Sequence, residues 1–75
     1  MSKLPVCSGA DAIGAFERAG WTRERQRGSH VTLTQPASPV VLTVPLHRTL
    51  GPGLLRTLLR KAGISVEEFT GRLDR

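Results

Sequence analysis

The chain has 75 residues and carries 11 Lys and Arg against 6 Asp and Glu, which gives a formal net charge of +5. A chain of this length can bury only a thin core, so we predict a single domain over residues 1–75 and no separate cofactor domain. Cys7 is the only cysteine, which excludes an internal disulfide and is typical of a reducing cytosol. No apolar run reaches the roughly 20 residues of a membrane helix, and Met1 to Val6 lack the pattern of a secretion signal. We therefore predict a cytoplasmic protein that does not contact a membrane.

Arginine supplies most of the positive charge. Nine of the 11 cations are arginine, whose planar fork of donors matches phosphate geometry better than lysine does. The charge indicates a polyanion such as nucleic acid, or an acidic protein, as the partner. A solvated basic surface without a partner would have the same composition.

The first predicted element is a helix over residues 9–19. Ser8 is its predicted N-cap, and Asp11 falls near the positive end of the helix. Gly20 follows as a left-handed C-terminal cap. Apolar residues recur at helical spacing and form the predicted buried face: Ala12, Ile13, Phe16 and Ala19.

The middle of the chain changes to a period of two, which predicts strands. Residues 21–26 and 30–34 form a predicted antiparallel hairpin around a turn at residues 27–29. In the second strand Val31 and Leu33 face one way, while His30, Thr32 and Thr34 face the other. A loop is predicted over residues 35–39, because its two prolines cannot donate to a sheet ladder. A third strand follows over residues 40–44 and ends at Pro45.

Two helices are predicted in the last third of the chain. The first runs from Pro52 or Gly53 to Ala62 and has one leucine-rich stripe. Ser65 and Glu68 then have the spacing of a capping box that opens a short last helix. This helix is anchored by Phe69 and Leu73, and residues 71–75 are predicted to fray.

The predicted order is α-β-β-β-α-α, which defines an α+β fold. Successive strands pair as an antiparallel meander of three, and the helices gather on one face of the sheet. The other sheet face stays open to solvent or to a ligand.

The sequence lacks the patterns of most metal and nucleotide sites. It has no Cys-x-x-Cys pair, no His-x-x-x-His pair, no cluster of carboxylates and no glycine-rich phosphate loop after a strand. We therefore expect no metal and no cofactor.

His30 is the best candidate for catalysis. An imidazole can accept and donate a proton near neutral pH, and RNA cleavage needs a base for the 2′-hydroxyl together with a cation for the phosphate. Arg23, Arg25 and Arg27 are the candidate cations, and the sequence does not choose among them. Gly28 lets a phosphodiester approach the backbone, and Ser29 adds a hydroxyl. The alternative is an exposed strand histidine with no catalytic role.

Other residues have a functional and a structural interpretation. His47 is a second acid, a phosphate contact or an exposed loop residue, and Cys7 is an activated thiol or a small buried residue. Phe16 and Trp21 either stack a base or pack in the core. Three cations of the leucine-rich helix either follow phosphates or form a solvated helix face: Arg56, Arg60 and Lys61.

Several segments spread over nearly the whole chain form a specific combination: Lys3-Leu4-Pro5, Ser8-Gly9, Glu17-Arg18-Ala19-Gly20-Trp21, Arg25-Gln26-Arg27-Gly28-Ser29-His30, Thr43-Val44-Pro45-Leu46-His47, Pro52-Gly53-Leu54-Leu55-Arg56 and Leu59 to Phe69. In these segments the chain resembles the HicA family of toxins, also called YcfA-like. Two positions differ from the usual family pattern. Gly51 stands where a lysine is common before Pro-Gly, and Val31 stands where an aromatic residue or a second histidine is common.

The resemblance implies a double-stranded-RNA-binding-like fold and metal-independent cleavage of messenger RNA that depends on His30. It also implies a HicB-type antitoxin that masks this site, so that the oligomeric state is set mainly by the antitoxin complex. The family's second histidine position matches His47. Two other functions remain open from the residues alone. One is a non-catalytic RNA-binding module, and the other is a basic surface that only docks an acidic protein.

Overall fold

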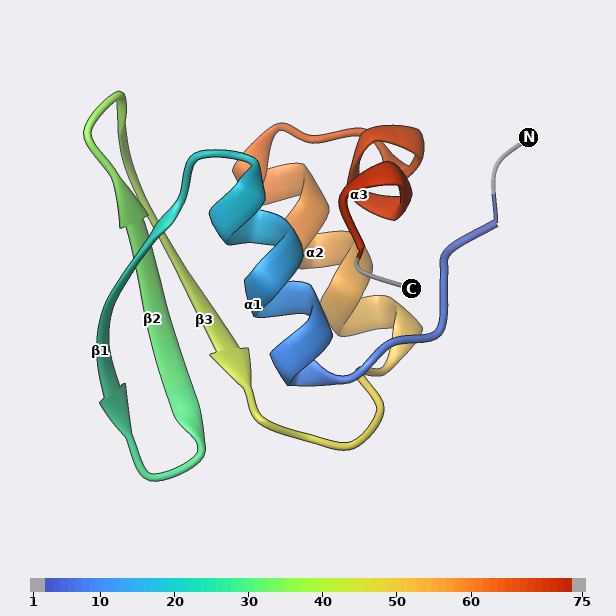
Figure 1. Cartoon of the computed structure of the whole chain (residues 1–75), viewed down its shortest axis with the longest axis horizontal. Coiled ribbons are helices and arrows are strands. Elements are labelled where there is room, and N and C mark those ends of the chain that lie inside the picture. The colour runs from blue at the N-terminus through green and yellow to red at the C-terminus, as the bar shows by residue number, and fades with distance from the viewer. Residues whose placement is uncertain (1–2, 74–75) are drawn as a thin grey trace.

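The computed structural model describes residues 3–73 and has the predicted α-β-β-β-α-α order. Figure 1 shows a three-stranded sheet on one side and the helices packed together on the other. The α+β fold predicted from the sequence is therefore confirmed. None of the helices within the described residues is long and apolar enough to cross a membrane. The elements are α1 (Gly9–Arg18), β1 (Thr22–Arg27), β2 (His30–Gln35), β3 (Ser38–Pro45), α2 (Pro52–Ala62) and α3 (Val66–Arg72).

The sheet is an antiparallel meander with β2 in the centre and β1 and β3 at the edges. Val31 of β2 pairs with Val44 of β3, and Leu33 pairs with Leu42. These four side chains are fully buried, so they form the face that the helices cover. A β-bulge interrupts the pairing of β1 with β2 between Arg23 and Arg25.

The predicted helix starts are confirmed for α1 and α3. The Ser8 hydroxyl accepts a hydrogen bond from the Asp11 N–H at 3.0 Å, and the Ser65 hydroxyl accepts one from the Glu68 N–H at 3.0 Å. These bonds satisfy N–H groups that have no partner inside the helix. The reciprocal half of the predicted capping box is absent, because the Glu68 carboxylate accepts a hydrogen bond from Arg72 instead.

The strands differ from the prediction at their ends. Trp21 precedes β1 and is buried rather than part of the strand, and the first turn contains only Gly28 and Ser29. Gly28 has a φ of +55°, which suits the first position of a two-residue hairpin turn. The loop predicted over residues 35–39 is also shorter, because only residues 36–37 form the turn. Pro39 lies inside β3, which it can do because β3 is an edge strand.

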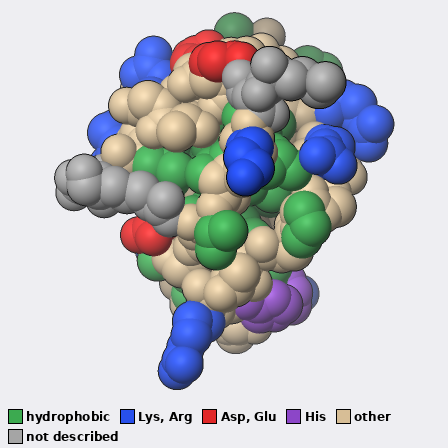
Figure 2. All heavy atoms as spheres, turned by 90° about the vertical axis from the view of Figure 1, so that its right-hand side faces the viewer, with side chains coloured by type: hydrophobic (Ala, Val, Ile, Leu, Met, Phe, Trp, Pro, Cys, Tyr) green, Lys and Arg blue, Asp and Glu red, His purple; other side chains and the backbone are tan. Residues whose placement is uncertain are grey.

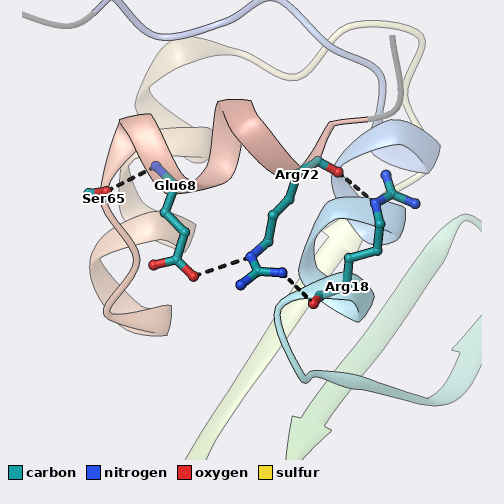
Figure 3. Close-up of polar contacts among 4 residues, drawn as sticks. All are labelled: Arg18, Ser65, Glu68 and Arg72. Atoms are coloured by element: carbon teal, nitrogen blue, oxygen red, sulfur yellow. Dashed lines mark hydrogen bonds and ion pairs between the residues drawn. The ribbon is translucent and has the colours of Figure 1, made fainter.

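The C-terminal helix extends further than predicted. Gly71 and Arg72 belong to α3 rather than to a frayed tail, and Leu73 is buried at 8% exposure, which confirms its predicted role as an anchor of this helix. Arg18 Nε donates to the Arg72 carbonyl at 2.6 Å, and Arg72 Nη1 donates to the Arg18 carbonyl at 2.7 Å (Figure 3). These bonds join the last residues of α1 and α3. Residues 74 and 75 of the predicted tail lie outside the described residues.

The core lies between the sheet and the three helices. Phe16 of α1 and Phe69 of α3 are fully buried, and their ring centroids lie 5.2 Å apart. Trp21 and Cys7 are also buried. The core-packing interpretation of Phe16, Trp21 and Cys7 is therefore confirmed. The apolar stripe predicted for α2 consists of Leu54, Leu55, Leu58, Leu59 and Ala62. Leu55, Leu58 and Leu59 are buried and Ala62 is half-buried as predicted, but Leu54 is exposed, because it lies in the first turn of the helix at the edge of the core.

Candidate functional site

Two loops and the start of α1 meet at one end of the molecule, the lower end in Figure 1. The Leu46 N–H donates to the Ser29 carbonyl at 2.6 Å, which joins the segment after β3 to the β1–β2 turn. The Gly9 N–H donates to the His47 carbonyl at 2.9 Å, which joins the same segment to α1. We call this region the histidine end. It consists of residues 27–30, residues 45–48 and the first turn of α1.

His30 is the first residue of β2 and is exposed. In the sheet it lies between Arg27 of β1 and Pro45 of β3. Directly opposite residues have Cα atoms about 4.5–5.5 Å apart and direct their side chains to the same face. Strand alternation directs His30 to the face opposite the buried Val31. The exposed Arg27 side chain therefore shares the open sheet face with His30.

The next row of the open face contains Arg25, Thr32 and Thr43, which pair across the three strands. Arg25 and Thr43 are exposed and Thr32 is half-buried. Beyond them the Thr34 hydroxyl donates to the Glu24 carboxylate at 3.2 Å, beside the β-bulge. The carboxylate of Glu24 thus lies beside the bulge, whereas Arg27 lies beside the turn without a neighbouring carboxylate in its row, which favours the turn as the place for an anion.

His47 lies two residues beyond Pro45, in the connection between β3 and α2. Its side chain is exposed, and its backbone carbonyl is fixed by the Gly9 N–H. Figure 2 shows histidine atoms together at the lower edge of the molecule. The fold thus brings both predicted histidines, with Arg25, Arg27, Gly28 and Ser29, to one region.

Gly9 is a residue of this region that the sequence reasoning missed. It is buried, and a Cβ at this position would lie 1.9 Å from the Pro45 carbonyl oxygen. Only glycine therefore allows the start of α1 to approach the end of β3 closely enough to bind the His47 carbonyl. The available signal was the Ser8-Gly9 pair, but its reason depends on Pro45, 36 residues later.

The three cations predicted on the leucine-rich helix are not brought together with His30. Arg56, Arg60 and Lys61 are exposed on α2. This helix begins close to the histidine end and runs away from it (Figure 1). At 1.5 Å per residue, Arg60 lies about 12 Å along the axis from Pro52. Arg60 and Lys61 belong to its last turn and form a separate basic surface.

The described residues offer neither a stacking platform nor a metal cluster. The aromatic side chains Phe16, Trp21 and Phe69 are all buried, so none is available to stack a base. Within residues 3–73 no group of three or more His, Cys, Asp or Glu side chains is close enough to hold a metal ion.

The comparisons with known proteins identify the family. A family model matches residues 9–64, which is more than half of the 75-residue chain. Its description is "HicA toxin of bacterial toxin-antitoxin". The match includes the whole histidine end and stops before α3. No curated protein matches the chain. The chain therefore belongs to the HicA toxin family of bacterial toxin-antitoxin systems.

Proposed function

We propose that this HicA-family protein is an endoribonuclease toxin that cleaves messenger RNA without a metal ion, with His30 as general acid or base. The observation that carries the proposal is the position of His30. It is exposed at the first position of β2, it faces Arg27 across the sheet, and the loop with His47 lies beside the same turn. A messenger RNA substrate places this activity in the cytoplasm.

The chemistry requires one proton acceptor, one proton donor and a cation. The imidazole of His30 takes the proton of a 2′-hydroxyl, and the 2′ oxygen attacks the adjacent phosphorus. The bond from phosphorus to the 5′ oxygen breaks, and this oxygen leaves with a proton from the general acid, for which His47 is the candidate. The products are a 2′,3′-cyclic phosphate and a 5′-hydroxyl. Arg27 stabilises the negative charge that builds up on the phosphate oxygens.

Binding of the RNA chain is assigned to the polar groups around the turn. Arg25 lies one row from His30 on the open sheet face, and Gly28 and Ser29 form the exposed turn itself. Because no described aromatic side chain is free to stack a base, we propose contacts to phosphate and ribose rather than to bases. Arg56, Arg60 and Lys61 of α2 stay candidates for contacts to a longer RNA.

The family also implies an antitoxin partner, and we propose that it is of the HicB type. The net charge of +5 favours an acidic partner. An antitoxin that covers the histidine end would block RNA from His30, which would neutralise the toxin without any change in its fold.

The test is cleavage of a labelled single-stranded RNA by the purified protein in the presence of a chelator. We expect the parent to produce fragments that end in a 2′,3′-cyclic phosphate, and His30→Ala to be slower by a factor of about 10²–10⁴. Gln35→Ala, at the other end of β2, is the matched control and should cleave as the parent does. If His30→Ala cleaves RNA as fast as the parent, the assignment of His30 is wrong.

The same experiment separates cleavage from binding alone. The open sheet face would also suit a non-catalytic RNA-binding module of this fold. A parent protein that binds the RNA but yields no product, with and without chelator, would favour the module.

A further inference from the structure

Hydrophobic side chains reach the surface close to the histidine end. Among the described residues, the large hydrophobic side chains that are exposed are Val6 at 70%, Val41 at 44%, Leu46 at 38% and Leu54 at 37%. Val41 lies in β3, where the open sheet face is otherwise polar. The other three lie outside the sheet. We call Val6, Leu46 and Leu54 the apolar patch.

Backbone hydrogen bonds hold together the segments that carry the apolar patch. Val6 precedes Cys7, whose carbonyl accepts a hydrogen bond from the Leu50 N–H at 2.9 Å. Leu54 follows one helical turn after Leu50, at the start of α2. Leu46 belongs to the same connection and adjoins His47. Leu46 therefore belongs to the histidine end, and Val6 and Leu54 lie on the segments that directly precede α1 and begin α2.

The surroundings of the patch are cationic. Lys3 and Arg48 are exposed within a few residues of Val6 and Leu46. Figure 2 shows hydrophobic side chains at the surface in the centre of one face, with lysine or arginine side chains beside them and histidine atoms below. An apolar centre with a charged rim is the usual composition of a protein–protein interface. Exposed valine and leucine side chains offer nothing to a phosphate, so RNA does not account for them.

We infer that the apolar patch is the surface on which the antitoxin docks. Apolar side chains of the antitoxin cover Val6, Leu46 and Leu54, and its carboxylates lie against Lys3 and Arg48. The inference rests on the proposed toxin function only for the identity of the partner. Because Leu46 adjoins His47, a partner held on the patch lies over the histidine end and excludes RNA from it.

The test uses a HicB-type antitoxin, purified alone, and measures its affinity for the toxin by calorimetry. The variant is Val6→Ser with Leu54→Ser, because neither residue belongs to the proposed catalytic or RNA-binding groups. We expect its affinity to fall about thirtyfold, the effect of losing an anchor at the centre of an interface. RNA cleavage by the variant should stay within about twofold of the parent, and inhibition by the antitoxin should weaken in parallel with binding.

Val41→Ser is the matched control, since Val41 is as exposed as Leu46 and Leu54 but lies in the sheet. It should bind the antitoxin as the parent does. Circular dichroism and thermal unfolding show whether the double variant is folded. The inference is overturned if the folded double variant binds normally, if Val41→Ser weakens binding equally, or if sedimentation shows that the patch joins two toxin copies. Binding is measured without RNA, so a toxin that fails to cleave RNA would refute the proposed function and leave this result intact.

Discussion

At its first residue α1 is joined to the rest of the molecule by backbone groups, whereas at its last residue it is joined by arginine side chains. Gly9 donates its N–H to the His47 carbonyl, and the neighbouring Leu46 N–H donates to Ser29. These bonds use backbone groups only, and the side chains that also support this end are neutral: Gln26 donates to the Gly28 carbonyl at 2.9 Å, and the Ser8 hydroxyl caps α1. The imidazoles and the guanidinium of Arg27 therefore stay free for a substrate.

The opposite end of α1 uses its cations for structure. Arg18 and Arg72 each donate to the other's backbone carbonyl, and Arg72 also pairs with Glu68 at 3.2 Å (Figure 3). Cations near the last turns of two helices satisfy carbonyl groups that have no partner within the helix. No hydrogen bond or ion pair engages the Arg27 side chain within residues 3–73. Hydrogen-bond partners therefore distinguish the arginines that join the two helices from Arg27, for which we propose a role in RNA cleavage.

Gly9→Ala should lower the free energy of unfolding more than any other change considered, because it disrupts the backbone contact between the start of α1 and the end of β3. The new methyl would lie 1.9 Å from the Pro45 carbonyl oxygen, so α1 must move and lose its hydrogen bond to His47. We expect the free energy of unfolding to fall by about 3 kcal/mol, measured by urea denaturation. Gly53→Ala is the control, because a Cβ there meets nothing within 4 Å. A Gly9→Ala protein as stable as the parent would show that this close approach is not required.

Arg27→Ala should reduce RNA cleavage about hundredfold, since a cation beside the reacting phosphate is removed. Its stability should stay within about 0.5 kcal/mol of the parent, because the side chain has no partner within the described residues. Single-turnover cleavage and urea denaturation of the same preparation measure both. A large loss of stability with normal cleavage would reverse the assignment of this arginine.

Arg72→Ala should show the opposite pattern. It removes the hydrogen bond to the Arg18 carbonyl and the pair with Glu68. Both groups are partly exposed, so we expect a loss of only about 1 kcal/mol, which is a decrease of about 5 °C in Tm for a domain of this size. Cleavage should stay within about twofold. Arg60→Ala, an exposed helix arginine, is the control and should change neither. If Arg72→Ala impairs cleavage more than Arg27→Ala does, the two ends do not have separate roles.

Sequence periodicity predicts the elements, but not the exact turn or the contacts between distant segments. The pattern predicts a turn over residues 27–29 that includes Arg27, whereas the two-residue turn of the structure places Arg27 in β1, opposite His30. The bond between Arg18 and Arg72 joins residues 54 positions apart, and no local pattern indicates it. The strand position of Pro39 also escapes the local pattern, because a proline fits in a strand only where that strand lies at an edge of the sheet.

Gly14→Ala should change the free energy of unfolding least. It tests how rigidly the Arg18 side chain is held at the last turn of α1. Alanine is favoured over glycine within a helix by about 1 kcal/mol. The new Cβ would lie 3.3 Å from an Nη atom of Arg18, which is the far end of a flexible side chain. We therefore expect a net gain below 1 kcal/mol in the parent, because the guanidinium must shift by a few tenths of an ångström. In an Arg18→Ala background, Gly14→Ala should raise the free energy of unfolding by the full amount of about 1 kcal/mol expected for this substitution. A double-mutant cycle measures the difference between the gains in the two backgrounds. Equal gains in both backgrounds would mean that Arg18 does not lie against Gly14 in solution.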